Sequence, residues 1–94
     1  MIISITTSRP DSAQRVEVET FLGGFLPRLE RQPGVVAVYH YSDEASGEST
    51  TLVVWQDEAS RLAYRESDLI GEAIRLERRL GLTSTRNAFP LTYP

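Results

Sequence analysis

A small set of side chains in this sequence has the chemistry to bind or transform a small molecule. His40 is the only histidine among 94 residues, and because an imidazole titrates near neutral pH it is the first candidate for a general base. Tyr64 is the second candidate for assisting proton removal. An apolar small-molecule pocket needs aromatic walls and one or two polar groups, for which the candidates are Trp55, Phe21, Phe25, Arg86 and Asn87. We expect such a pocket to enclose ~300 Å³ or more.

Each candidate also has a purely structural interpretation. His40 lies near the end of an expected strand, where a hydrogen-bonded or solvated histidine is common. For Trp55 the favoured interpretation is a core anchor at the junction of strand and helix, whereas Tyr64 fits the core and a pocket wall about equally. Phe21 and Phe25 stand one helical turn apart, as core residues do. A single histidine without a second histidine or an acidic partner is a poor ligand set, so we do not expect a metal site.

Arg86 and Asn87 are neighbours on an expected strand, so one of them points inward, and the sequence leaves open which. An inward arginine needs a carboxylate or a ligand anion as its partner. Other charges are instead expected on a solvated helix face, with pairs three residues apart. These are Glu72, Arg75, Glu77, Arg78 and Arg79.

The hydrophobic periodicity predicts the elements that must position these groups, in the order βαββαβ. Strands are expected at residues 2–7, 35–41, 50–56 and 82–89, and helices at residues 13–31 and 58–80. Pro27 predicts a kink or break in the first helix, and Ser67-Asp68 is a candidate interruption of the second. The prediction is one α+β domain, residues 1–94, with a ferredoxin-like antiparallel sheet of four strands.

Composition narrows the class of protein. The net charge is −3 and the basic residues are dispersed, so no nucleic-acid partner is expected. No run of ~18 apolar residues predicts a membrane span. The absence of cysteine excludes disulfides and thiolate chemistry. Without a recognisable secretory signal, the expected location is the cytoplasm.

The strand patterns predict a partner subunit. If one sheet face met water, apolar and polar residues would alternate along each strand. Instead both faces of the second strand are apolar, with Val36, Val38 and His40 on one side and Val35, Ala37, Tyr39 and Tyr41 on the other. Two helices cover only one face, so a second copy packed face to face is the simplest cover. We therefore expect a homodimer.

Two stretches carry a resemblance to a known family. Residues 52–60, Leu-Val-Val-Trp-Gln-Asp-Glu-Ala-Ser, continue to Tyr-Arg-Glu-Ser-Asp at residues 64–68. A strand ending in tryptophan, a capping acid and a helix with an aromatic and a Ser-Asp step resemble the antibiotic biosynthesis monooxygenase family. Residues 26–35 look like the end of that family's first helix. The resemblance implies a dimeric α+β barrel.

The same resemblance implies oxidation of phenolic or anthrone-like substrates by O₂ without metal or flavin. A haem-degrading branch of the family uses a tryptophan and a histidine where this chain has Tyr64 and Ile74, and Ile74 cannot ligate iron. The sequence thus favours a cofactor-independent monooxygenase for a small aromatic or quinol-like compound. Two alternatives remain: a ligand-binding or stress-associated barrel without turnover, and an isomerase or lyase on the same scaffold.

Overall fold

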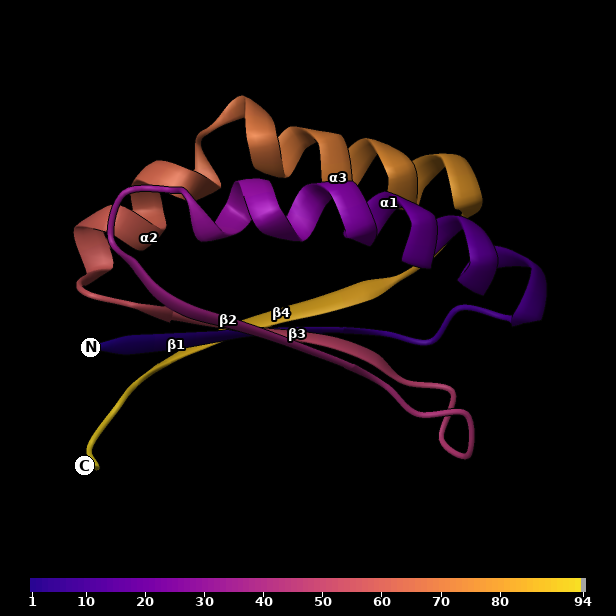
Figure 1. The fold of residues 1–94 in the computed structure, drawn as a ribbon, viewed down its shortest axis with the longest axis horizontal. Helices are drawn as coiled ribbons and strands as arrows, with labels where there is room; N and C mark the ends of the chain where they lie inside the picture. The colour runs from indigo at the N-terminus through magenta and orange to yellow at the C-terminus, as the bar shows by residue number, and fades with distance from the viewer. Residues whose placement is uncertain (94) are drawn as a thin grey trace.

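The chain folds into a four-stranded antiparallel sheet covered on one face by three helices, as the computed structural model of residues 1–93 shows (Figure 1). The elements are β1 (Ile2–Ser8), α1 (Ser12–Glu30), β2 (Val35–Ser42), β3 (Ser49–Trp55), α2 (Glu58–Arg65), α3 (Asp68–Leu80) and β4 (Ser84–Pro90). The strand order in the sheet is β2-β3-β1-β4. The predicted ferredoxin-like α+β fold is confirmed.

Helix α1 begins at a capping box, in which the Asp11 carboxylate accepts from the Gln14 backbone N–H at 2.8 Å and the Gln14 side chain accepts from the Asp11 backbone N–H at 2.9 Å. The expected break at Pro27 does not occur, because the helix continues to Glu30. Pro27 costs one backbone hydrogen bond near the helix end. The buried side chains of Phe25 and Leu29, on either side of it, hold that turn on the sheet.

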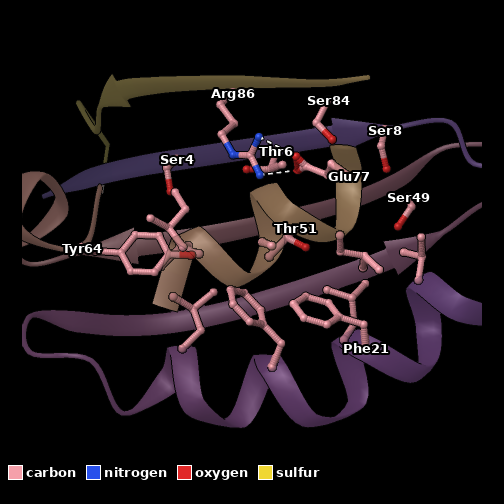
Figure 2. Close-up of a pocket in the computed structure, with 18 of the residues that line it drawn as sticks. Ser4, Thr6, Ser8, Phe21, Ser49, Thr51, Tyr64, Glu77, Ser84 and Arg86 are labelled. Atoms are coloured by element: carbon pink, nitrogen blue, oxygen red, sulfur yellow. Dashed lines mark hydrogen bonds and ion pairs between the residues drawn. The ribbon is translucent and has the colours of Figure 1, made fainter. Parts of the chain in front are cut away.

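The second helical region is interrupted where the sequence predicted. Helix α2 ends at Arg65 and α3 begins at Asp68, with the Ser67 hydroxyl donating to the Tyr64 carbonyl at 2.6 Å in the break. Helix α3 stops at Gly81, whose φ of 66° lies in the left-handed region that favours glycine. The break gives α2 a direction of its own, and this places Tyr64 over the sheet (Figures 1 and 2).

Strand β2 contains a bulge, and because of it two residues face the opposite side of the sheet from the one predicted. Val35 pairs with Trp55 while Ala37 pairs with Val54, so Val36 is an extra residue without a partner. Val35 therefore packs against the core beneath the helices, on the same side as Val38, and Val36 is exposed. The predicted alternation was wrong for Val35 and Val36 and holds from Ala37 onward.

The two faces of the sheet differ in cover. Beneath the helices lies a core of Phe25, Leu29, Val53, Trp55 and Leu69. No element within residues 1–93 covers the opposite face (Figure 1). Large apolar side chains with substantial exposure on β2 and β4 are Val36, Tyr39, Tyr41 and Phe89. Among the helices of the described chain, none is long and apolar enough to cross a membrane.

Candidate active site

A cavity of about 140 Å³ lies between the sheet and the helices. Its roof comes mainly from apolar side chains of α1 and α3, and its floor comes from the strands. The roof includes Val18, Phe21, Leu22, Phe25, Leu29, Ile70, Ala73 and Leu76, and the floor includes Ser4, Thr6, Ser8, Ser49, Thr51, Val53, Ser84 and Ala88. The volume is smaller than the ~300 Å³ expected for a general ligand pocket. It is close to the ~150 Å³ apolar cavity that holds one benzene ring in another protein.

The floor is built from rows of side chains that the strand register aligns across the sheet. Directly paired residues of antiparallel strands point to the same face, with side chains ~5 Å apart. One row, here named the histidine–threonine row, runs across all strands as His40, Thr51, Thr6 and Arg86. Two residues further along each strand lies the serine row, formed by Ser42, Ser49, Ser8 and Ser84. In the other direction the floor turns apolar toward Val53 and Trp55.

Arg86, and not Asn87, is the inward residue of β4. Its guanidinium forms two hydrogen bonds with the carboxylate of Glu77 on α3, one of them 3.0 Å from Nη1 to Oε2 (Figure 2). Glu77 thus supplies the carboxylate that an inward arginine needs, and the expectation that it belongs to a solvated face was wrong. The exposed Asn87 also borders the cavity, but it pairs with Ile5, so its side chain points to the opposite face of the sheet.

Two further charges of that helix, Glu72 and Arg79, also pair differently from the prediction. Arg28 on α1 holds Glu72 with two hydrogen bonds, of 2.8 and 2.7 Å, and Arg79 reaches Glu17 on α1 at 2.7 Å. These bridges join α3 to α1 instead of linking residues three apart within α3. These ion pairs lie on the outside of the helix layer, since each of the four side chains is between one third and two thirds exposed.

Tyr64 reaches the cavity from α2, with its hydroxyl directed toward the centre of the lining residues (Figure 2). Its ring lies against Trp55 at a centroid distance of 5.3 Å. Burial raises the pKa of Tyr64 to about 12, against the opposing effect of the nearby Arg86 and Arg65 charges. Tyr64 is therefore a neutral phenol at physiological pH, which suits it to donate a hydrogen bond.

Trp55 stands behind the cavity wall. It is fully buried, and its indole N–H donates to the Ser4 hydroxyl at 3.1 Å. Ser4 lines the cavity, so Trp55 influences the site through that hydroxyl and through Tyr64. Phe21 and Phe25 both line the roof, with rings stacked at 5.0 Å and 25°. A flat ring can pack against this aromatic surface.

His40 also lies one side chain away from the cavity. Its Nδ1 is 3.0 Å from the hydroxyl of Thr51, which does line the cavity. Burial lowers the pKa of His40, opposed by the charge of Glu19 on α1 and by a hydrogen bond with the backbone of Thr50. The ring is therefore neutral at physiological pH and able to accept a proton.

Sequence reasoning missed the hydroxyl floor and Glu77. The signal for part of the floor was present, because Ser4 and Thr6 alternate with Ile3 and Ile5 along β1. What the sequence lacked was the register that brings these residues beside Thr51 and Arg86. Within residues 1–93 no three histidine, aspartate or glutamate side chains gather as a metal ligand set would.

Comparison with known proteins identifies the fold. No family model and no curated protein matches the chain in sequence. Among solved structures, a candidate antibiotic biosynthesis monooxygenase from Deinococcus radiodurans superposes with a TM-score of 0.92, at 14% identity over 100% of this chain and 95% of that one. The chain has the fold of the antibiotic biosynthesis monooxygenases.

Further structures share the antibiotic biosynthesis monooxygenase fold. SnoaB from Streptomyces nogalater, described as a cofactor-independent oxygenase, gives a TM-score of 0.79 at 21% identity, covering 99% of this chain and 94% of that one. A candidate antibiotic biosynthesis monooxygenase from Nitrosomonas europaea gives 0.86 at 8% identity, covering 99% and 100%. Because these identities are low, the likeness establishes the fold alone.

Proposed function

We propose that the chain is a cofactor-independent monooxygenase that oxidises a small aromatic or quinol-like compound in the cavity between sheet and helices. The observation that carries the proposal is the pairing of a stacked aromatic roof with a floor of hydroxyls in one cavity. The cavity volume of about 140 Å³ suits a single ring. Fused-ring compounds are larger than this volume.

The proposed chemistry begins with ionisation of a ring hydroxyl. Loss of its proton yields an electron-rich phenolate, which can itself transfer electrons to O₂. A carbon–oxygen bond then forms at a ring carbon and gives a hydroperoxide, which takes up the proton lost by the ring hydroxyl. Cleavage of its O–O bond, with loss of the proton on that ring carbon, leaves one oxygen atom as the quinone oxygen and releases the second as water. Tyr64 is suited to stabilise the phenolate, since its hydroxyl is directed into the cavity and stays protonated. The guanidinium of Arg86 also lines the cavity and adds positive charge there, although Glu77 holds both of its terminal nitrogens.

Two facts support an oxygenase over other chemistries on this fold. The roof is built mainly of apolar side chains, and an apolar surrounding strengthens the interaction of a reactive anion with fixed donors. SnoaB, a solved structure with the same fold, is described as a cofactor-independent oxygenase. Neither fact specifies the substrate, so the experiment must sample a panel.

The test is O₂ uptake by the purified chain with single-ring phenols and quinols, followed by mass spectrometry of products formed under ¹⁸O₂. One labelled oxygen per product molecule is the expected result. Thr6→Val removes a floor hydroxyl and should reduce uptake, while Thr85→Val alters a strand threonine on the opposite face and serves as the matched control. Absence of uptake across a panel that binds would refute the proposal.

A binding protein without turnover is the second candidate, favoured by the small volume of the cavity. It predicts a one-to-one complex measurable by calorimetry and no product with or without O₂. An isomerase or lyase predicts product under strictly anaerobic conditions. The same panel of compounds, assayed in air and under nitrogen, separates these activities from oxygenation.

We further propose that the working unit is a homodimer formed through the uncovered sheet face. Tyr39 is 62% exposed there and Phe89 is 51% exposed. Each would be costly to leave in water at ~25 cal/mol for every Å² of apolar surface. A two-fold pair that buries the same patch from both subunits is the commonest solution for such a face.

A further inference from the structure

We propose that the proton of the bound phenol passes to His40 through the hydroxyl of Thr51. In this arrangement Thr51 touches the substrate and His40 is a positioning residue behind it that stores the proton. The inference rests on the proposed function to the extent that it requires a phenolic ligand in the cavity. It does not require that the ligand be oxidised.

The first support is the contact itself. Thr51 of β3 and His40 of β2 are direct partners across the sheet, and both side chains project toward the helices. The distance from Nδ1 to Oγ1 is 3.0 Å, well within hydrogen-bonding range. Thr51 lines the cavity and His40 does not. The Thr51 hydroxyl therefore connects the imidazole of His40 to the cavity.

A threonine hydroxyl can carry out the transfer because it donates and accepts at once. The substrate O–H bond breaks as its proton moves to Thr51 Oγ1. In the same step the original Thr51 O–H bond breaks and an N–H bond forms at His40 Nδ1. The products are a phenolate and an imidazolium, and the threonine is unchanged. No electrons are transferred in this step.

The second support is the surroundings of His40. Its Nε2 lies 3.5 Å from the hydroxyls of Ser42 and Ser49, which can accept from it. An N–H on Nε2 leaves the Nδ1 lone pair free for Thr51. Since β2 is an edge strand and the ring is half-buried, the imidazolium can release its proton to water at the end of the hairpin.

The other charged groups around the path do not compete for the proton. From α1, Glu19 faces His40 and favours the imidazolium. From α2, Tyr64 has a pKa of about 12 and is already protonated. The same helix also contributes Arg61 and Arg65 to the cavity lining, and a guanidinium donates hydrogen bonds but cannot accept a proton. Arg86 of β4 and Glu77 of α3 lie at the far end of the histidine–threonine row. They are hydrogen-bonded to each other, so the Glu77 carboxylate is already engaged. The packed residues Ser49, Thr50 and Thr51 of β3 carry no charge.

The test uses 4-nitrophenol, whose phenolate is coloured, as a probe that binds without being consumed. The absorbance of the bound probe and the NMR signal of the His40 ring are followed on the same samples across neutral pH. In the native chain, binding of the probe should shift the His40 signal toward the imidazolium position. Thr51→Val should abolish that shift and lower the ratio of bound phenolate to phenol about tenfold, the factor expected when one hydrogen bond to a charged oxygen is lost.

Three further variants make the result specific. Thr51→Ser keeps a hydroxyl and should restore both signals, and Thr85→Val on the opposite face should leave both unchanged. His40→Gln retains hydrogen bonding and should give a bound probe whose ionisation follows bulk pH alone. If Thr51→Val does not fold, Thr51→Ala provides the same comparison.

Two outcomes overturn the inference. A His40 signal that does not respond to the probe in the native chain shows that His40 is not the acceptor. An equal response in Thr51→Val shows that the proton takes another path. Since neither readout involves O₂, the path can stand when no oxidation is found, and O₂ uptake can persist when the path fails. Where turnover is found, Thr51→Val should lower kcat more than it raises KM.

Discussion

The ion pair between Arg86 and Glu77 allows a sharp test of how the cavity floor is built. We consider Arg86→Met, which keeps the length of the side chain and removes its charge. The Arg86 side chain is 21% exposed and the Glu77 side chain is 15% exposed. After the substitution, the unpaired Glu77 carboxylate is therefore largely shielded from water. Loss of one partner costs 3–5 kcal/mol in fully buried pairs, whereas exposed pairs contribute about 1 kcal/mol or less.

For this partly buried pair we therefore expect Arg86→Met to lower the free energy of unfolding by about 2–3 kcal/mol. In a domain of this size that corresponds to a fall in Tm of roughly 10–20 °C. Urea unfolding followed by circular dichroism measures the change, with protein concentration held constant because a dimer would link stability to concentration.

The double variant Arg86→Met with Glu77→Leu separates charge from packing. Because it removes the unpaired carboxylate, it should recover all but about 1 kcal/mol of the loss. A single variant that loses less than ~1 kcal/mol would mean that Glu77 is effectively solvated. A double variant as unstable as the single one would assign the cost to packing. Either result would refute the role of Arg86 as the charge partner that Glu77 requires.

Three other predictions follow from the same structure. Tyr64 should remain protonated at pH 10.5, because burial raises its pKa to about 12. NMR of ring-labelled tyrosine measures its ionisation, and Tyr64→Phe assigns the signal. Ionisation of Tyr64 near pH 10 would contradict this burial. Burial holds the pKa of His40 below its ordinary 6.5, so the unfolded chain binds that proton more readily and stability should rise as pH increases through 6.5. His40→Gln should flatten this part of the pH–stability curve, and an unchanged slope would count against it. Tyr39→Glu and Phe89→Glu should each convert a dimer into a monomer in light scattering, and a monomeric native chain would remove the proposed interface.

Local signals in the sequence predicted the elements well. The apolar residues of α1 recur every three or four positions, Gly81 marks a helix end, and Ser67-Asp68 marks the break between α2 and α3. Such features depend on residues close together in the chain. The helix limits predicted from them lie within a residue or two of those observed.

What the sequence could not show depends on pairing between distant segments. Within Val35-Val36-Ala37-Val38 every residue is apolar, so no alternation reveals the bulge at Val36. Arg86 meets Glu77 only because β4 turns back beneath α3, and the charged pattern of α3 by itself suggested a solvated face. The histidine–threonine row likewise exists only through the register of four strands.

Helix α2 has a consequence for the rate at which a ligand can exchange. It is eight residues long and none of its residues is fully buried, in contrast to α1 and α3. Isolated helices shorter than ~12–15 residues are marginal in water, so α2 can open locally at a small fraction of the free energy needed to unfold the domain. Because Tyr64 moves with it, the residence time of a bound ring should follow the stability of this short helix and not that of the sheet. Substitutions that strengthen the core would then leave exchange unchanged, while those that strengthen α2 would slow it.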